Sequence, residues 1–323
     1  MNLSRTDYYK YLFNVYGLRK GTITKSWHDP TVVDLSGIDE EPVTGSYPID
    51  FSKDDVPGLL TDDNGVPMID YATLGIHYNP WFVGHIALGR FTKWKNTKDD
   101  SHLDRFRILA DWFVENAVPS PNGVTWLYHF DWFGHDKPWR SGLSQAHGIS
   151  TLLRAASIFG DAKYEDVGKK AANEMLSPMD KGGTLFHWPD DTITIEESVK
   201  IPPSTVLNGH LFSVIAAWEA GRYFDNNRYL KLADKGWQFV LKNIDQYDLG
   251  YWSCYSLKNN SNGLKDIASP HYHEVHIGLL QVAAAITGND KFTQYANKFR
   301  DYQRDTSCRL RAVWMKRMSK LTA

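Results

Sequence analysis

The sequence predicts a mainly α-helical protein, an incomplete α/α toroid of about four helical hairpins with a small N-terminal β-containing arm. One observation is a repeat, in which similar stretches set Tyr164, Tyr229 and Phe292 in register, 65 and then 63 residues apart. The other is the spacing within each copy, because apolar or small residues follow at plus three, four and seven, as on one face of a helix. A lone helical hairpin cannot bury its own apolar face, so we expect stacked copies to bury it jointly.

The first 75 residues differ in composition from the rest. A short amphipathic stretch, Tyr8 to Tyr16, leads into a region rich in Pro, Gly and Asp. There the dipeptide Asn64-Gly65, between two short apolar runs, is a β-hairpin signal. We therefore expect residues 1–75 to form an arm that contains a β-hairpin.

Residues 76–305 are expected to form the toroid domain, and residues 306–323 a basic tail. The helical hairpins are predicted over residues 80–116, 142–177, 207–243 and 272–303. The long connections between them cover residues 117–141, 178–206 and 244–271, and each is rich in aromatic or polar residues. Connections of that length inside a compact domain usually carry function, so they are where we expect the site.

The length and the cysteine count are typical of a globular protein. A chain of 323 residues has a core large enough to hold a shaped cleft. Cys254 and Cys308 are its only cysteines and give neither a disulfide framework nor a CxxC metal pattern. The first 20 residues lack the apolar core of a signal peptide, and no window reaches transmembrane length. A soluble protein, cytoplasmic rather than exported, is expected.

The charge balance argues against a nucleic-acid partner, because the formal net charge is −2. The exception is the C-terminal tail, where five basic residues occur without an acid: Arg309, Arg311, Lys316, Arg317 and Lys320. A solvated basic helix end is one interpretation of this tail, and contact with a membrane surface or an anionic glycan is the other. Aromatic residues make up 14% of the chain, a surplus that suits stacking on sugar rings.

Three polar residues occupy one position of the repeat. Gln145, His210 and His273 align near the start of a presumed inner helix, where they would converge at the mouth of the toroid. Polar groups with Trp and Tyr nearby suit a saccharide cleft, since rings stack on sugar faces and polar groups bind hydroxyls. The alternative is that they cap helices or bond to neighbouring loops.

Three segments hold most of the chemically capable residues and open the second, third and fourth hairpins. They cover residues 139–155, 195–213 and 247–281. They resemble the signature stretches of the D-glucuronyl C5-epimerase family, which inverts C5 of glucuronic acid within heparan-type polymers. The matching residues are Glu196, Glu197 and Ser204, then Val206, Leu207, Asn208 and Gly209, then Tyr247, Asp248, Tyr255 and Leu257, and finally Tyr272, His273 and His276.

The resemblance covers roughly residues 75–305 and implies a cofactor-free isomerase acting on a uronic acid residue of an acidic polysaccharide. It implies that Glu197, Tyr255 and Tyr272 are among the catalytic groups and that Asn208 lines the substrate cleft. It also implies a homodimer as one alternative for the oligomeric state. The chain departs from the animal members at two positions, with Ser198 where they have Tyr and Lys258 where they have Arg.

The chemistry of C5 inversion asks for similar groups. Removing the C5 proton places negative charge beside a carboxylate, which positive groups must hold, and Lys258 and Arg140 are our candidates. One group then takes the proton and another returns one on the opposite face, for which Glu197 with Tyr272 or Tyr255 are candidates. A tyrosine base, with an ordinary pKa of about 10, needs positive charge or a histidine partner nearby. His271, His273 and His276 flank Tyr272.

Other interpretations of the same residues remain open. Glu197 could be a helix-entry carboxylate and Tyr255 a loop-packing residue. The His273-x-x-His276 pair has metal-like spacing but falls one residue short of HExxH, and no phosphate loop or dinucleotide fingerprint occurs, so we expect neither metal nor cofactor. The rival functions are a polysaccharide lyase on a uronate polymer, which shares the proton abstraction, and a non-catalytic glycan-binding protein. A glycoside hydrolase would need two facing carboxylates.

Overall fold

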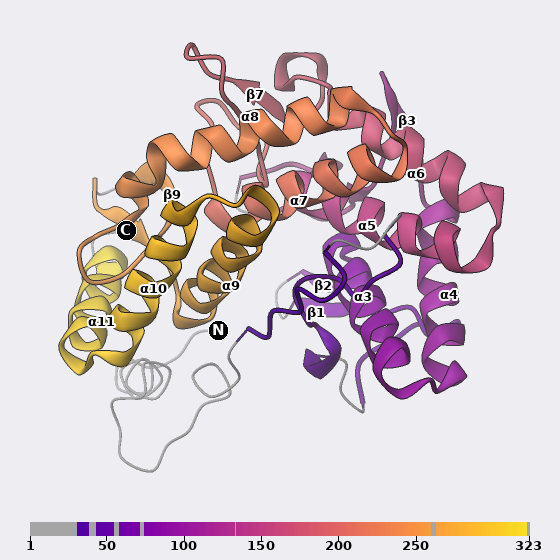
Figure 1. Cartoon of the computed structure of the whole chain (residues 1–323), viewed down its shortest axis with the longest axis horizontal. Helices are drawn as coiled ribbons and strands as arrows, with labels where there is room; N and C mark the ends of the chain where they lie inside the picture. The colour runs from indigo at the N-terminus through magenta and orange to yellow at the C-terminus, as the bar shows by residue number, and fades with distance from the viewer. Residues whose placement is uncertain are drawn as a thin grey trace. The chain divides into compact units, whose positions relative to one another are not determined.

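The computed structural model describes residues 31–38, 43–54, 58–71, 74–132, 134–259 and 263–321, whose elements Figure 1 labels. The amphipathic stretch expected at Tyr8 to Tyr16 lies outside these residues. The chain divides into two compact units. Unit 1 consists of the described residues of Met1–Val33, Ser204–Asn208 and Val240–Ala323, and unit 2 of those of Asp34–Pro203 and Gly209–Phe239.

Paired α-helices make up most of the described chain, as the repeat predicts. The pairs are α3 (Pro80–Thr97) with α4 (Asp100–Glu115), α5 (Gly142–Phe159) with α6 (Ala162–Glu174), α7 (Leu207–Tyr223) with α8 (Asn227–Asn243), and α9 (Pro270–Thr287) with α10 (Asp290–Arg304). A further helix, α11 (Thr306–Leu321), follows α10. All four predicted hairpins are therefore confirmed within a few residues of their expected bounds.

Each hairpin turns in the same way, which explains why the turns share a sequence signal. The turn holds one residue in the left-handed conformation, at Lys98, Gly160, Asp225 and Gly288. The next residue is Asp or Asn, and its side chain accepts a hydrogen bond from a backbone N–H of the following helix. The left-handed residue ends one helix and the Asx residue caps the next, so two neighbouring residues fix the turn.

Helices α5 and α9, each the first of its pair, begin where the sequence supplies capping residues. Ser141 precedes α5 and accepts from the Leu143 N–H, and Ser269 precedes α9 and accepts from the Tyr272 N–H. Pro270 then occupies the first position of α9, where a missing N–H costs nothing. These caps fix the helix starts, which is where the predicted site residues lie.

Within each unit, the helices pack against one another. In unit 2, α3 lies against α5, and α4 lies against α6. In unit 1, α10 contacts both α9 and α11, and the three lie side by side in Figure 1. This packing bears out the prediction of a mainly α protein built from helical hairpins. Among the described residues, no helix has the length and apolarity needed to cross a membrane.

Short antiparallel strand pairs occupy the connections, a feature that we predicted only for the arm. In the arm, Thr61 and Pro67 bridge across the expected Asn64-Gly65 turn. The arm pair is β1 (Ile69–Tyr71) with β2 (Gly75–His77); the later pairs are β3 (Val118–Ser120) with β4 (Gly123–Thr125), β5 (Leu127–Tyr128) with β6 (Trp139–Arg140), β7 (Leu185–His187) with β8 (Ile193–Ile195), and β9 (Cys254–Asn259) with β10 (Lys265–Ile267). Strands this short give too weak an alternation for a sequence-based prediction.

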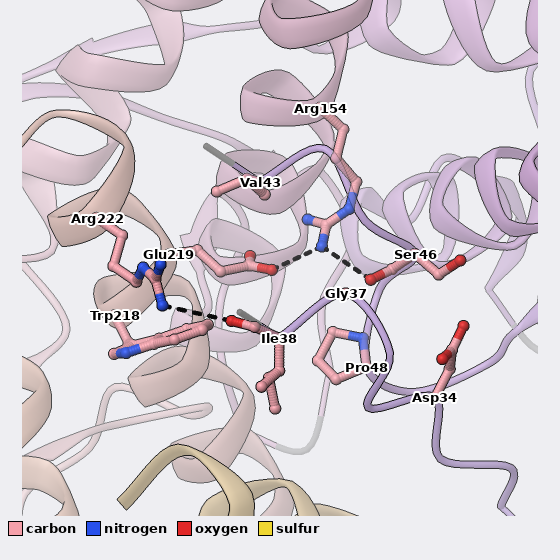
Figure 2. A pocket seen from close by; sticks show the side chains of 10 residues that line it. All are labelled: Asp34, Gly37, Ile38, Val43, Ser46, Pro48, Arg154, Trp218, Glu219 and Arg222. Carbon is pink, nitrogen blue, oxygen red and sulfur yellow. Dashed lines mark hydrogen bonds and ion pairs between the residues drawn. The ribbon is translucent and has the colours of Figure 1, made fainter. Parts of the chain in front are cut away.

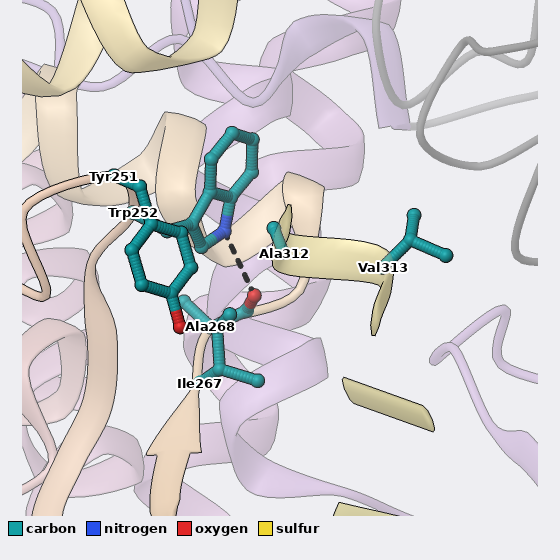
Figure 3. Close-up of a cluster of buried hydrophobic side chains, with 6 residues drawn as sticks. All are labelled: Tyr251, Trp252, Ile267, Ala268, Ala312 and Val313. Carbon is teal, nitrogen blue, oxygen red and sulfur yellow. Dashed lines mark hydrogen bonds between the residues drawn. The ribbon is translucent and has the colours of Figure 1, made fainter. Parts of the chain in front are cut away.

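Unit 1 has its own apolar cluster beneath the β9–β10 pair. Tyr251, Trp252, Ile267, Ala268, Ala312 and Val313 form it, as Figure 3 shows. The Trp252 indole N–H donates to the Ala268 carbonyl at 3.0 Å, which satisfies its buried polar atom. Tyr255 and Tyr272 pack against this cluster and are only partly buried. The cluster therefore supports both predicted catalytic tyrosines.

Candidate functional site

In unit 2, the end of strand β8 positions Glu197. All three residues of β8 are buried, and Glu196 follows it with its backbone bonded on both sides. Its N–H donates to the Thr184 carbonyl at 2.8 Å, and its carbonyl accepts from the Gly142 N–H at the start of α5, at 2.9 Å. The backbone next to Glu197 is therefore fixed to two other elements.

The Glu197 side chain lies against Gly209, in the first turn of α7. A Cβ at Gly209 would be 2.5 Å from Glu197 Oε2 and 2.7 Å from Glu197 Cβ, so only a glycine leaves room for this carboxylate. The phenol of Tyr128 is close enough that the Glu197 charge adds to burial in raising the Tyr128 pKa. The Gly of the Val-Leu-Asn-Gly motif thus has a physical role, which is to admit the side chain of the Glu pair.

Ser198 takes part in a contact of its own. Its hydroxyl hydrogen-bonds to His135 Nε2, in the connection before α5. Burial, with the nearby Lys200 charge, lowers the pKa of His135. The departure from the animal sequences at this position is therefore matched by a neighbouring imidazole, a partner that the motif gave no means of predicting.

Unit 1 brings the two predicted catalytic tyrosines together. The ring centroids of Tyr255, on β9, and Tyr272, in the first turn of α9, are 4.8 Å apart with the planes inclined by 55°. The exposed ring of His271 lies edge-on to Tyr272, with the centroids 5.3 Å apart. Two phenols and an imidazole gathered at a helix start can transfer protons at more than one point.

The segment that holds Asn208 is tied to the same part of unit 1. Val206 bridges to Ser256 of β9, and the Tyr247 hydroxyl donates to the Thr205 carbonyl at 2.7 Å. Asn208 is 2% exposed, and its Oδ1 finds no hydrogen-bond donor among the residues that the structure describes. A buried amide oxygen of this kind is suited to a ligand hydroxyl or N–H.

The Tyr247-Asp248 motif has a structural role in the described chain. Asp248 is nearly buried, accepts from the Gly250 N–H at 2.7 Å and pairs with Lys298 of α10 at 2.6 Å. Together with the Tyr247 bond described above, these contacts hold the loop that enters β9. They fix where that strand begins, and so where Tyr255 lies.

The two predicted carboxylate-binding cations are placed differently. Arg140, on β6, pairs with the buried carboxylate of Glu174 at 3.2 Å, and its side chain is 24% exposed. Lys258 is exposed on β9, but strand alternation sets it on the face opposite Tyr255. The pairing register of β9 and β10 shifts between Lys265 and Ile267, so the ribbon is irregular here. Within unit 1, the described contacts do not bring Lys258 to the tyrosine pair.

The three polar residues of the repeat make one structural contact, repeated three times. Gln145 Nε2 donates to the Ala171 carbonyl at 2.9 Å, His210 Nε2 to the Gly236 carbonyl at 3.1 Å, and His273 Nε2 to the Phe299 carbonyl at 2.9 Å. In every copy the acceptor lies 26 residues later, on the second helix of the hairpin.

The other polar atom of each of these side chains binds the segment that precedes its helix. Gln145 Oε1 accepts from the Thr125 hydroxyl, while His210 Nδ1 and His273 Nδ1 accept from the N–H groups of Ile195 and Ser253. All three residues are buried. These contacts agree with the alternative in which the three residues bond to neighbouring loops. They already occupy the polar atoms that a sugar would need.

Burial keeps the histidines of these helices neutral. Burial lowers the pKa of His210 to about 4 and that of His273 to about 3, although in each a backbone carbonyl partly opposes the shift. Burial also lowers the pKa of His276 well below its ordinary value. His273 and His276 are therefore uncharged near neutral pH and do not supply the positive charge that a base at Tyr272 needs.

Ser253 is a residue that the sequence did not single out. Its hydroxyl lies 2.8 Å from His273 Nδ1 and 2.9 Å from His276 Nδ1 and links the two imidazoles. Because His273 donates from Nε2, its Nδ1 is the acceptor. No pattern in the sequence marks Ser253, since it lies in the connection before the helix that holds both histidines.

A separate pocket of about 370 Å³ lies in unit 2, away from every predicted site residue. Figure 2 shows Arg154 among the residues that line it, with Nη2 bonded to the Glu219 carboxylate at 2.8 Å and to the Ser46 carbonyl at 3.5 Å. Arg154 and Glu219 are almost fully buried. The two side chains pair with each other, and Arg154 also binds a backbone carbonyl of the arm. The pocket is therefore a structural junction. Elsewhere in the described chain, no three His, Cys, Asp or Glu side chains are grouped to hold a metal ion.

Comparison with known proteins identifies relatives. The family model described as D-glucuronyl C5-epimerase C-terminus matches residues 122–301, more than half of the chain. The D-glucuronyl C5-epimerase of Caenorhabditis elegans is 27% identical over 223 residues, which cover 63% of this chain and 35% of that protein. An uncharacterised protein of Methanocaldococcus jannaschii is 25% identical over 283 residues, 78% of this chain and 88% of that one. The chain thus spans about a third of the worm protein and most of the archaeal one.

Two solved structures are similar at lower identity. An unsaturated glucuronyl hydrolase from Bacillus sp. GL1 aligns with a TM-score of 0.48 at 16% identity, over 70% of this chain and 62% of that one. A GH76 α-mannanase from Bacteroides thetaiotaomicron aligns with a TM-score of 0.46 at 11% identity, over 69% and 55%.

Proposed function

Because the chain belongs to the D-glucuronyl C5-epimerase family, we propose that it inverts C5 of a uronic acid residue, of the glucuronate-to-iduronate type, within an acidic polysaccharide. The family match is the observation that carries this proposal. The described contacts supply groups suited to the reaction. Residues 76–305 would form the catalytic domain.

The tyrosine pair of unit 1 is proposed to move the protons. Inversion removes the C5 hydrogen from one face of the sugar and returns a proton to the other, so two groups at different points are needed. Tyr255 lies on a strand and Tyr272 at a helix start, so their hydroxyls are carried by separate elements. Their rings are inclined to each other, with the centroids 4.8 Å apart. The Asn208 amide oxygen, buried and without a donor among the described residues, would accept from a sugar hydroxyl.

Glu197 is proposed as a catalytic carboxylate on separate grounds. Its backbone is held by two neighbouring elements, and Gly209 leaves the space that it occupies. Its carboxylate is packed against the start of α7, where any side chain larger than hydrogen at position 209 would displace it.

Deuterium uptake tests the proposed reaction and separates it from its rivals. The protein would be incubated in deuterated buffer with a panel of glucuronate polymers, beginning with unsulfated heparosan. C5 deuteration without new ultraviolet absorbance is the expected result. An unsaturated uronate would indicate a lyase instead, and binding with no exchange on any uronate polymer would indicate a glycan-binding protein.

Site variants test the residues. Tyr272→Phe, Tyr255→Phe and Glu197→Gln should each lower the exchange rate by about 100-fold or more, since a positioned acid or base contributes about 10²–10⁴. Tyr302→Phe is the control, because Tyr302 packs against the same cluster and its hydroxyl donates a long hydrogen bond to Asp248, at 3.4 Å. Exchange that survives all three substitutions would overturn the residue assignment while leaving the reaction intact.

A further inference from the structure

The helix α11 combines a strong positive charge with an exposed aromatic ring. Its sequence from Thr306 to Leu321 contains five basic residues and no acid. Trp314 is 55% exposed and Leu310 is 49% exposed, whereas most large apolar side chains of the described chain are buried. Leu310 and Trp314 are four positions apart on the helix, so their exposed side chains are neighbours on one surface.

The inner face of α11 is already occupied. Ala312 and Val313 are buried in the apolar cluster of unit 1, which Figure 3 shows, and Lys316 Nζ donates to the Ile267 carbonyl at 2.8 Å. Helical spacing therefore turns the residues at the intervening positions outward.

The outward face consists of four residues, which we call the α11 platform: Leu310, Arg311, Trp314 and Arg317. The Arg317 guanidinium lies over the Trp314 ring, 5.4 Å from its centroid, and that of Arg311 lies 4.2 Å from the centroid of Tyr251. Stacking of this kind holds a guanidinium in place. Arg311 is exposed, so it can present its planar guanidinium to an anion.

We propose that the α11 platform binds the acidic polysaccharide at a point separate from the reacting sugar. A ring such as Trp314 stacks on the C–H face of a pyranose, and a guanidinium binds a uronate carboxylate through two N–H groups. The two recognition elements of a uronate polymer are thus side by side on one helix. This inference rests on the proposed function for the identity of the polymer.

The platform is continuous with the strand pair that holds a catalytic candidate. Helix α11 packs against β10, and β10 pairs with β9, which holds Tyr255. Lys258 and Lys265 are exposed on these two strands. The acid of the ribbon, Asp266, is partly buried and accepts from the Ser256 hydroxyl at 3.1 Å. Positive charge therefore runs from the platform along the ribbon, a layout that suits a long anionic chain.

A membrane surface is the competing partner, because basic amphipathic helices often bind anionic lipid. Such a helix inserts its apolar face into the lipid. In α11 that face, formed by Ala312 and Val313, is buried in the apolar cluster of unit 1. The outward face offers two apolar residues separated by arginines, a composition that favours a sugar polymer.

The test compares long and short substrates in the full chain. Affinity for long heparosan, measured by calorimetry, should fall about 10-fold in Trp314→Ala and in Arg311→Ala. KM for the long polymer should rise by a similar factor, while kcat and the kinetics on an oligosaccharide of a few sugars stay unchanged. The controls are Arg304→Ala, which removes a 73% exposed arginine of α10, and Ile201→Ala, which truncates a 77% exposed apolar residue.

Each outcome decides between the alternatives. If binding of long polymer falls in the platform variants although no C5 exchange is found, the platform stands and the proposed reaction fails. If exchange occurs but the platform variants bind and turn over long polymer like the controls, the platform proposal is wrong. Loss of binding to phosphatidylserine vesicles, with polymer binding unchanged, would assign the platform to a membrane surface.

Discussion

The substitution Gly209→Ala tests whether the position of the Glu197 carboxylate matters. The added Cβ would be 2.5 Å from Glu197 Oε2, which is 0.9 Å short of the 3.4 Å at which ordinary contact begins. The carboxylate must therefore shift by about 1 Å, and a misplacement of that size can cost about 100-fold in rate. We expect deuterium exchange at C5 to fall by about 10- to 100-fold.

The effect on stability should be smaller than the effect on rate. Alanine gains about 0.5–1 kcal/mol over glycine within a helix, while overpacking costs about 1–3 kcal/mol, so the variant should stay folded at 25 °C. Gly168→Ala is the matched control, because that helical position meets Leu152 Cβ at 3.5 Å and Leu153 Cδ2 at 3.6 Å, which are ordinary contacts. A folded Gly209→Ala protein with the wild-type exchange rate would refute the reasoning.

Two predictions concern stability. Acidification from pH 7 to pH 5 should destabilise the protein, since the neutral, buried His210 and His273, with pKa values of about 4 and 3, take up protons only on unfolding. Each such histidine contributes up to about 1.4 kcal/mol per pH unit below its unfolded pKa of about 6.5. His210→Gln, which places the amide of the equivalent Gln145 there, should flatten this dependence in urea unfolding; an unchanged slope would contradict it. Arg154→Ala leaves Glu219 buried without its cation and should lower the free energy of unfolding by about 3–5 kcal/mol, so an unchanged urea midpoint would show that the pair is dispensable.

The hairpins could be predicted because their signals are local. Periodic apolar residues, an Asx cap and a left-handed turn residue lie within a few positions of one another, and together they fix where each helix begins and ends. The short strand pairs could not be predicted. They are only two to six residues long, too short to show a clear alternation of apolar and polar residues.

The site residues show the same division, between features with a local sequence signal and features that arise only from contacts in the fold. The family resemblance implied that Tyr255 and Tyr272 are both catalytic groups, and the structure places their ring centroids 4.8 Å apart. The internal repeat aligned Gln145 with two histidines at one shared position. What that position does, bonding a carbonyl 26 residues later, depends on how the two helices of a hairpin approach each other. The Ser253 bridge likewise arises from folding, because it joins a connection to a helix.

The most direct test of the central claim is the fate of the C5 hydrogen of a uronate polymer in deuterated buffer with the wild-type protein. Proton NMR should show the C5–H signal of glucuronate disappearing while iduronate signals appear, at a rate that Tyr272→Phe lowers about 100-fold or more. A C5–H signal that persists at full intensity on every uronate polymer would contradict the account.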